Sequence, residues 1–256
     1  MDFKEWEPYY QIILDKFDFS KTEDEETAAF LSRLFENAIK SVSENAGKNG
    51  FFSSDLLKRM LFQKNVVICG NAPSLEFEYY QLMEKMKERA TKGRFFEDSV
   101  FVAADGAAFV LIQAGRYPEV IVSDLDGKDP GDVFNEIKAL DFGSVFLIHA
   151  HGDNSDKIQK YWPLLENKIQ NGHIIPTCQC RPPKHLFNFG GFTDGDRCVF
   201  LANAFGAKRM ILIGFDFNDF NVTPQKKKKL ECAEKLIQKI RQKKENKILY
   251  FSEIEF

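Results

Sequence analysis

The sequence predicts an α/β fold: a mostly parallel, Rossmann-like sheet with helices on both faces, preceded by a helical N-terminal segment. From residue 65 onward, short apolar runs alternate with helical patterns. These runs are continuously apolar, as strands that are buried on both faces are. Before residue 63 the chain has helical periodicity and no strand signal. We therefore expect a helical segment at 1–62 and an α/β domain at 63–256.

The helical pattern of the N-terminal segment is clearest over 30–42, where apolar side chains recur at helical spacing. Thr22 and Glu25 form a capping-box pattern that predicts the start of this helix. A polar loop over 43–50 and a short helix ending at Leu61 are expected to follow. The segment is expected either to cap the main domain or to form part of an interface in a homo-oligomer.

The alternation after residue 65 divides into strands and helices of ordinary length. Strands are expected at 66–69, 100–104, 120–122, 145–148, 210–213 and 248–251. Helices are expected near 76–91, 106–115, 131–140, 154–170, 195–206 and 225–244. In open parallel sheets, ligands bind where the carboxyl ends of the strands meet. The polar motifs of this sequence directly follow its strands, so we expect a ligand site at that edge.

Composition narrows the class of protein. The chain has 256 residues, of which 44% are hydrophobic and 29% charged, as is typical of a soluble globular protein. A net charge of −3 gives no indication of nucleic-acid binding. No apolar run approaches the roughly 20 residues of a membrane helix, and the N-terminus lacks a signal-peptide core, so we expect no membrane partner and a cytoplasmic location. The five cysteines are expected to be reduced packing residues.

The sequence VIVSDLDG at 120–127 is an apolar strand that runs into two acids and a glycine. Residues i and i+2 of a strand point to the same side, so Asp124 and Asp126 can aim at one point. Two carboxylates at that distance repel each other unless a cation lies between them. Magnesium is the cation that carboxylates and substrate phosphates most often share. Because Asp and Gly are also ordinary turn residues, a plain polar turn is the alternative.

The first two expected strands end in CGNAPSL and AADGAA. Gly70 permits a tight turn, and the helix after Asn71 and Ser74 presents free N–H groups that suit a phosphate. The alternative is an ordinary turn in which Ser74 caps the helix. In the second motif Asp105 lies at the strand end, and Gly106 is small enough for a ligand to approach the helix start.

The fourth expected strand ends in HAHGDN. His149 and His151 lie on one face if the chain is extended, and Asp153 and Asn154 follow them. Histidines with several carboxylates could also bind zinc or iron. Four histidines in the whole chain are few for a dedicated site of that kind, so oxygen-ligated magnesium is favoured.

Two further motifs carry charge. In FGGFTDGDR, Thr193 or Asp194 can cap the next helix, and Arg197 falls in its first turn. A cation there is unfavourable for the helix dipole unless an anion is present, which makes Arg197 a candidate phosphate ligand. The lysines at 226–229 belong to a stretch, 225–244, whose apolar residues keep helical spacing, which indicates a surface helix with a solvated basic face rather than a polyanion site.

The ordered motifs GNAPSL, ADGAA, SDLDG, HAHGDN, GGFTDGDR and IGFDF resemble the archaeal 6-hydroxymethyl-7,8-dihydropterin pyrophosphokinase family. The resemblance covers roughly 62–256. The ADGAA and SDLDG pair is also similar to the catalytic half of thiamine pyrophosphokinases. Those enzymes add a C-terminal β-sandwich that helps bind thiamine, and we expect no such module here, so thiamine is not the expected substrate.

The resemblance implies a magnesium-dependent enzyme that transfers diphosphate from ATP to 6-hydroxymethyl-7,8-dihydropterin and releases AMP, in folate or methanopterin biosynthesis. Such a transfer depends on positioning and charge neutralisation. Asp124 and Asp126 are then the expected metal ligands, with Asp105 contributing directly or through water. His151 or Asp153 is expected to orient the attacking hydroxyl.

The remaining roles follow from the same resemblance. Arg197 is the expected ligand of a phosphate oxygen, and the turn at 70–74 is expected to hold nucleotide or substrate. A reduced pterin needs an acid or amide at its amino-pyrimidine edge, for which Asp194 and Asn154 are candidates.

Two other functions fit parts of the sequence. Bacterial members of the same broad domain family are linked to flagellin glycosylation, and Asp124-Leu-Asp126 could bind a metal and nucleotide sugar as a DxD motif does. A noncatalytic nucleotide-binding module is the third possibility. Several acids at neighbouring strand ends argue against it, because their repulsion costs stability unless a metal or a mechanism compensates.

Overall fold

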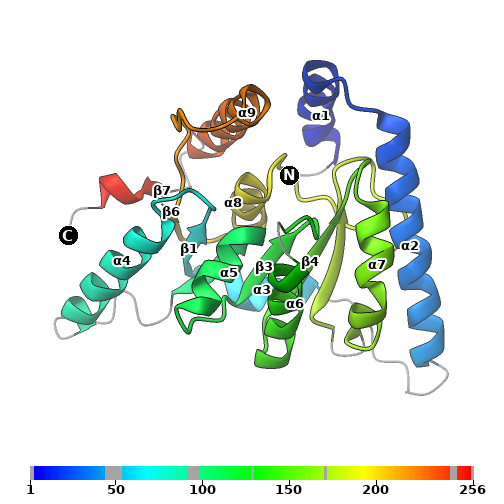
Figure 1. Ribbon diagram of the computed structural model, residues 1–256, viewed down its shortest axis with the longest axis horizontal. Helices are drawn as coiled ribbons and strands as arrows, with labels where there is room; N and C mark the ends of the chain where they lie inside the picture. Colours follow the sequence, from blue (N-terminus) through cyan, green and yellow to red (C-terminus); the bar gives the residue numbers. More distant parts are fainter. Residues whose placement is uncertain are drawn as a thin grey trace.

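The computed structural model describes residues 3–43, 54–90, 99–127, 130–169, 172–242 and 247–254. Its centre is a seven-stranded sheet in which every neighbouring pair is parallel (Figure 1). The strands are β1 (Asn65–Cys69), β2 (Val100–Ala104), β3 (Val120–Ser123), β4 (Val145–Ala150), β5 (Ile174–Cys178), β6 (Arg209–Ile213) and β7 (Lys247–Tyr250). The predicted α/β class and parallel sheet are therefore confirmed.

The strand order is β5-β4-β3-β2-β1-β6-β7, so the chain runs outward from β1 to β5 and then returns to the other side of β1. With right-handed crossovers, the helices that join β1 to β5 cover one face, and those that follow β5 and β6 cover the other. The first group is α4 (Leu75–Ala90), α5 (Asp105–Gln113), α6 (Pro130–Ala139) and α7 (Ser155–Glu166). The second group is α8 (Asp194–Ala204) and α9 (Pro224–Arg241), which pack on each other.

The order in which strands are added reverses at β1, which pairs with β2 on one side and with β6 on the other. Such a switch point is where open α/β sheets bind ligands. Gly70 and Gly214 follow these two strands and lie against each other. A Cβ on Gly70 would lie 2.6 Å from the Gly214 carbonyl oxygen, and Gly214 has a φ of +68°. Glycine at both positions lets the two turns meet at the mouth of the site.

The N-terminal segment forms α1 (Phe3–Phe17), α2 (Lys21–Ser43) and α3 (Ser54–Leu61), which confirms the predicted helices. Figure 1 shows α2 lying along α7 at one end of the sheet, where it also contacts β4 and β5. Trp6 packs edge-on against Phe200 of α8 at 5.7 Å between ring centroids. Phe35 meets Trp162 of α7 in the same way at 5.1 Å. Since these side chains join the main core, the segment caps the α/β domain.

One strand was not predicted, and one predicted helix start is wrong. The strand is β5, whose apolar run contains Pro176; the proline is tolerated since β5 lies at the sheet edge. Helix α2 begins at Lys21, and Ser20 Oγ accepts the Glu23 N–H at 3.2 Å, so the Thr22–Glu25 capping box does not open it. The loop expected at 43–50 lies, apart from its first residue, outside the described ranges.

Several boundaries also shift. Ser43 is the last residue of α2, and Phe251 belongs to a short 3-10 helix (Phe251–Glu253) that follows β7. A second 3-10 helix (Leu140–Phe142) extends α6. Across the described ranges, none of the helices has the length and apolar character needed to span a membrane.

Candidate active site

A pocket of about 520 Å³ lies at the carboxyl ends of the central strands. Its walls come from the turns after β1, β2, β3 and β6 and from α5, α8 and α9. The sequence-predicted residues that line it are Gly70, Asn71, Asp105, Gly106, Asp126, Thr193 and Asp194. Those outside its lining are Ser74, Asp124, His151, Asp153, Asn154 and Arg197. The pocket has the volume of a typical small-molecule site.

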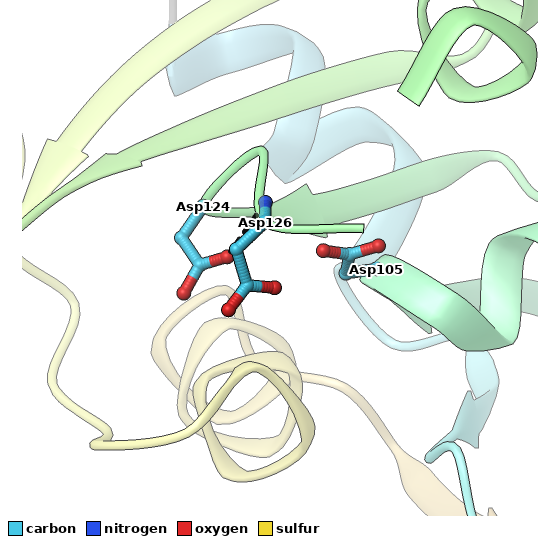
Figure 2. A group of neighbouring side chains, drawn as sticks. All are labelled: Asp105, Asp124 and Asp126. Carbon is cyan, nitrogen blue, oxygen red and sulfur yellow. Dashed lines mark hydrogen bonds between the residues drawn. The ribbon is translucent and has the colours of Figure 1, made fainter. Parts of the chain in front are cut away.

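Three aspartates converge beside this pocket, and we call Asp105, Asp124 and Asp126 the acid cluster. Carboxylate oxygens of all three lie within 4.8 Å of one another. Figure 2 shows Asp124 and Asp126 extending from one turn and Asp105 approaching from the start of the neighbouring helix, α5. Asp105 is 6% exposed and Asp124 8%, whereas Asp126 faces solvent. The predicted convergence is confirmed; metal binding stays a prediction.

The convergence has a different local cause from the one expected. Strand β3 ends at Ser123, so the two aspartates lie on a turn and not on an extended strand. Leu125 between them is buried and left-handed, with a φ of +65°. Ser123 Oγ accepts the Leu125 N–H at 3.0 Å. Asp124 Oδ1 accepts the Asp126 N–H at 3.2 Å, and this second hydrogen bond is drawn in Figure 2. Leu125 anchors the turn in the core while both acids face the site.

The electrostatics of the acid cluster favour a bound cation. Burial, followed by the neighbouring carboxyl of Glu136, raises the pKa of Asp105 to about 11. Burial and the charge of Asp124 likewise raise the pKa of Asp126. Neither Asp105 oxygen accepts a hydrogen bond from any described residue. Magnesium binds carboxylate oxygens and would compensate the charges that burial and mutual repulsion disfavour, so the residues present fit that ion.

His151 pairs with the Asp124 carboxylate. Its Nε2 lies 3.0 Å from Asp124 Oδ2, and its Nδ1 contacts the Asp153 carboxylate. Burial lowers the pKa of His151, but the hydrogen bonds to Asp124 and Asp153 outweigh it and raise the pKa to about 9. For Asp124, burial is outweighed by His151 and by the charge of Arg197, which hold its pKa well below the usual range. An imidazolium–carboxylate pair therefore forms at neutral pH.

Asn154 has a role that the sequence did not reveal. Its side chain is fully buried, and its amide donates to the carbonyl oxygens of Asp124 at 2.9 Å and His149 at 2.7 Å. Its own Oδ1 accepts the His151 N–H at 3.0 Å. Asn154 thus joins the turns that follow β3 and β4. All of its polar groups are engaged away from the pocket, where it was expected to meet the pterin.

Arg197 lies behind the pocket and not in its wall. It is 7% exposed; Nη1 donates to Asp194 Oδ1 at 2.9 Å and Nη2 to Gln179 Oε1 at 3.3 Å. Burial and the charge of Asp124 raise the pKa of Asp194 to about 7, although Arg197 opposes the rise. Thr193 is the N-cap residue of α8, as one of the two predicted alternatives required. In this arrangement Arg197 acts on Asp194 and Asp124 from outside the pocket lining, and its contact with a phosphate stays a prediction.

The turn after β1 reaches the pocket through Gly70 and Asn71. A Cβ on Gly106 would lie 2.0 Å from the Asn71 amide nitrogen, so glycine is needed for Asn71 to lie over the start of α5. Ser74 precedes α4 and lies outside the pocket lining.

His149 is buried, with Nδ1 3.0 Å from Thr177 Oγ1. In the described ranges, neither His149 nor His151 belongs to the group of potential metal ligands, which consists of carboxylates alone.

Five residues that were not predicted as site residues also shape the site: Asp24, Glu136, Gln179, Phe215 and Phe217. The two phenylalanines line the pocket beyond β6. Asp24 and Glu136 are buried acids on helices, 2% and 0% exposed. The available signal was an acid on the apolar face of each helix. Gln179 follows the strand that was not predicted, so no signal pointed to it.

The chain is thus an α/β protein with an acid cluster and a ligand-sized pocket at the switch point of an all-parallel sheet. The family described as 6-hydroxymethylpterin diphosphokinase MptE-like matches residues 36–221. That match covers more than half of the sequence, and the chain belongs to this family. The resemblance stated from the motifs is therefore confirmed.

Three archaeal proteins, each called 6-hydroxymethyl-7,8-dihydropterin pyrophosphokinase, are similar over nearly the full chain. The Methanocaldococcus jannaschii protein is 35% identical, over 97% of this chain and 100% of its own length. The Pyrococcus furiosus protein is 33% identical, over 98% and 100%. The Methanothermobacter thermautotrophicus protein is 33% identical, over 93% and 94%. The similarity includes the N-terminal helices as well as the sheet.

Proposed function

We propose that this protein transfers diphosphate from ATP to the hydroxymethyl group of 6-hydroxymethyl-7,8-dihydropterin, giving the pterin diphosphate and AMP. The observation that carries the proposal is the acid cluster, whose three carboxylates lie within 4.8 Å of one another beside a pocket of about 520 Å³. The names of the archaeal relatives support the pterin as acceptor. The product would serve a folate- or methanopterin-type cofactor.

The acid cluster is proposed to hold Mg²⁺ through Asp105, Asp124 and Asp126. When bound, the ion neutralises phosphate oxygens and the charge that develops on the leaving AMP. Asp126, the exposed member, borders the pocket directly. Asp124 is held ionised by His151, 3.0 Å away, and by the nearby charge of Arg197. We propose that His151 orients Asp124, since carboxylates occupy both of its ring nitrogens.

The phosphates are proposed to lie between the starts of α5 and α9. Ala104 precedes α5 and provides no side-chain cap, so the first N–H groups of that helix remain open to an acceptor near Gly106. Lys226 in the first turn of α9 lines the same pocket and supplies a positive charge. These groups replace the Arg197 contact that the sequence suggested.

The flat rings of the substrates are proposed to lie against the apolar part of the pocket. Its aromatic residues are Phe109 of α5 and Phe215 and Phe217 after β6. A Cβ on Gly70 would lie 3.0 Å from the Phe215 ring, so the turn after β1 packs tightly against that ring. Aromatic faces suit a planar heterocycle. Asp194 lines the pocket and stays our candidate for the amino-pyrimidine edge of the pterin.

The proposal is tested by incubating the purified protein with ATP, Mg²⁺ and 6-hydroxymethyl-7,8-dihydropterin and separating the products by chromatography. We expect AMP and the pterin diphosphate in equal amounts, no reaction in EDTA, and recovery when Mg²⁺ is restored. Formation of ADP would exclude diphosphate transfer. Hydrolysis of a nucleotide sugar with no pterin product would favour the sugar transferase.

A further inference from the structure

Asp24 is a buried carboxylate of the N-terminal segment that reaches the main domain. It lies in the first turn of α2 and is 2% exposed. Tyr10 of α1 donates its hydroxyl to Asp24 Oδ2 at 2.6 Å. The other donors come from the α/β domain: the Gly152 N–H, at 2.7 Å from Oδ1, and the Gln179 amide, at 3.0 Å from Oδ1 and 2.8 Å from Oδ2. One carboxylate thus links two N-terminal helices to the turns after β4 and β5.

The first of these contacts leads to the acid cluster through the turn after β4. Gly152 follows His151, whose Nε2 lies 3.0 Å from Asp124 Oδ2. A Cβ on Gly152 would lie 3.0 Å from the Cβ of Glu23, so glycine lets α2 approach this turn closely. The hydrogen bond to Asp24 therefore fixes the backbone that carries His151.

The second contact leads to the pocket through α8. Gln179 is 5% exposed; its amide N–H₂ faces Asp24 and its Oε1 accepts from Arg197 Nη2 at 3.3 Å. Arg197 in turn donates to Asp194 Oδ1 at 2.9 Å, and Asp194 lines the pocket. Trp6 of α1 adds a hydrogen bond to the Gln179 carbonyl oxygen at 2.9 Å. Each contact in this series is a hydrogen bond with a defined donor and acceptor. Because the Asp24 carboxylate can only accept, it determines which group donates and which accepts in the contacts that follow.

We propose that Asp24 is a positioning residue for the active site, through which the N-terminal helices set the orientation of His151 and Arg197. The kinetic part of this inference rests on the proposed diphosphate transfer. Asp24 lies outside the pocket lining, so it acts through Gly152 and Gln179. The helices of residues 3–43 are then part of the catalytic apparatus and do more than cover the sheet.

The order of donors and acceptors in the hydrogen bonds from Asp24 to Arg197 can be tested by exchanging them. In Asp24→Asn, an amide NH₂ at the position of Oδ2 lies about 2.8 Å from the Gln179 NH₂, the distance of the present hydrogen bond. Two donors at that distance repel, while the oxygen at the position of Oδ1, 3.0 Å away, remains an acceptor for the same amide. We expect Gln179 to relieve the clash by turning its amide over. Its NH₂ then faces Arg197, whose Nη2 loses its acceptor, Gln179 Oε1. Gln179→Glu alone places two carboxylates in contact. The double variant restores donor–acceptor order, because the new amide at position 24 donates to the new carboxylate at position 179, which also accepts from Arg197.

The four proteins of this cycle are compared by thermal unfolding and by steady-state kinetics. We expect each single variant to lower kcat about tenfold or more, with KM for ATP and pterin changed less than about threefold. The double variant should recover kcat to within about threefold of wild type. Glu25→Gln is the matched control: it makes the same chemical change one residue along on an exposed side chain paired with Lys21, and should leave kcat unchanged.

Each outcome decides the question. An unchanged kcat in Asp24→Asn, or losses that multiply in the double variant, would overturn the proposal. If a single variant does not fold, recovery of folding and turnover by the double variant still supports it. If the wild type makes no pterin diphosphate, the proposed function fails separately. Crystal structures of Asp24→Asn and of the double variant then test the inference, since the hydrogen bond from Arg197 Nη2 to the side chain at position 179 should be lost in the first and kept in the second.

Discussion

Replacing Asp105 by Asn should separate the stability of this protein from its activity. The Asp105 carboxyl is 6% exposed and lies beside Glu136, and neither of its oxygens accepts a hydrogen bond from any described residue. Without a metal ion, the acid cluster therefore weakens the fold. Asn keeps the shape of the side chain and cannot ionise, so its burial requires no uptake of a proton. We expect the variant to be more stable than the metal-free wild type and inactive.

The size of the effect follows from the ionisation of Asp105. Burial and Glu136 raise its pKa to about 11 in the folded protein, from an ordinary value of 3.8. At pH 7 folding therefore takes up about one proton. This uptake lowers the free energy of unfolding by about 1.4 kcal/mol for each pH unit above the unfolded pKa, or by at most about 4 kcal/mol at pH 7. Asp105→Asn removes this cost, but burying the amide of Asn offsets part of the resulting gain in stability. We expect the free energy of unfolding to rise by about 1–3 kcal/mol, which raises Tm by about 3–10 °C.

The pH dependence has a definite sign. Because the pKa of Asp105 is raised on folding, its cost is small near pH 4 and grows as the pH rises toward 9. The assay is thermal unfolding in EDTA at pH 5, 7 and 9, with the exposed Asp156→Asn as control. Saturating Mg²⁺ and ATP should stabilise only the wild type and narrow the gap. A lower Tm for Asp105→Asn at pH 9 in EDTA, or retained turnover, would contradict this account of Asp105.

Three other predictions concern the same site. Asp126→Asn should lower kcat at least about 100-fold while Tm changes by less than about 2 °C, because the side chain is exposed; full activity would remove it from the metal site. Phe217→Ala should raise KM for the pterin or ATP about tenfold with kcat nearly kept, and an unchanged KM would exclude ring binding there. Mg²⁺ binding at pH 7, measured by calorimetry in two buffers, should release about one proton from Asp105; no release would argue against its role as ligand.

The sheet could be predicted from the sequence because its strands are buried on both faces and read as apolar runs. The exception, β5, shows the limit of that signal. Pro176 argues against a strand by itself, and only the position of β5 at the sheet edge makes the proline acceptable. The predicted start of α2 is wrong because two residues could cap the helix, and Ser20, whose Oγ accepts the Glu23 N–H, does so in place of Thr22.

The acid cluster could be predicted because parallel strands bring successive polar motifs to one edge. Its detailed geometry could not. The sequence predicted that Asp124 and Asp126 converge because they alternate along an extended strand. In the structure they converge because the buried, left-handed Leu125 forms a turn between them. The partners of Asp105 and Arg197 come from distant parts of the chain, Glu136 and Gln179, which no local pattern connects. A sequence shows which groups reach the site; tertiary contacts assign them to the ligand or to one another.

The similarity of the relatives adds one point about the N-terminal helices. The matches in the Methanocaldococcus jannaschii and Pyrococcus furiosus proteins cover 97% and 98% of this chain, so they extend into residues 3–43. Asp24 lies in that part of the chain and contacts Gly152 and Gln179 directly. A role of this segment in positioning the active site is consistent with that extent.

In the proposed reaction, the acid cluster serves the transfer of an intact diphosphate. ATP labelled with ³²P at the β-phosphate distinguishes this transfer from that of a single phosphoryl group, in a reaction with Mg²⁺ and 6-hydroxymethyl-7,8-dihydropterin. We expect the label to move to the pterin product while unlabelled AMP accumulates, and Asp126→Asn to abolish the transfer. Label that stays in ADP, or transfer that continues unchanged in Asp126→Asn, would contradict the proposed role of the acid cluster.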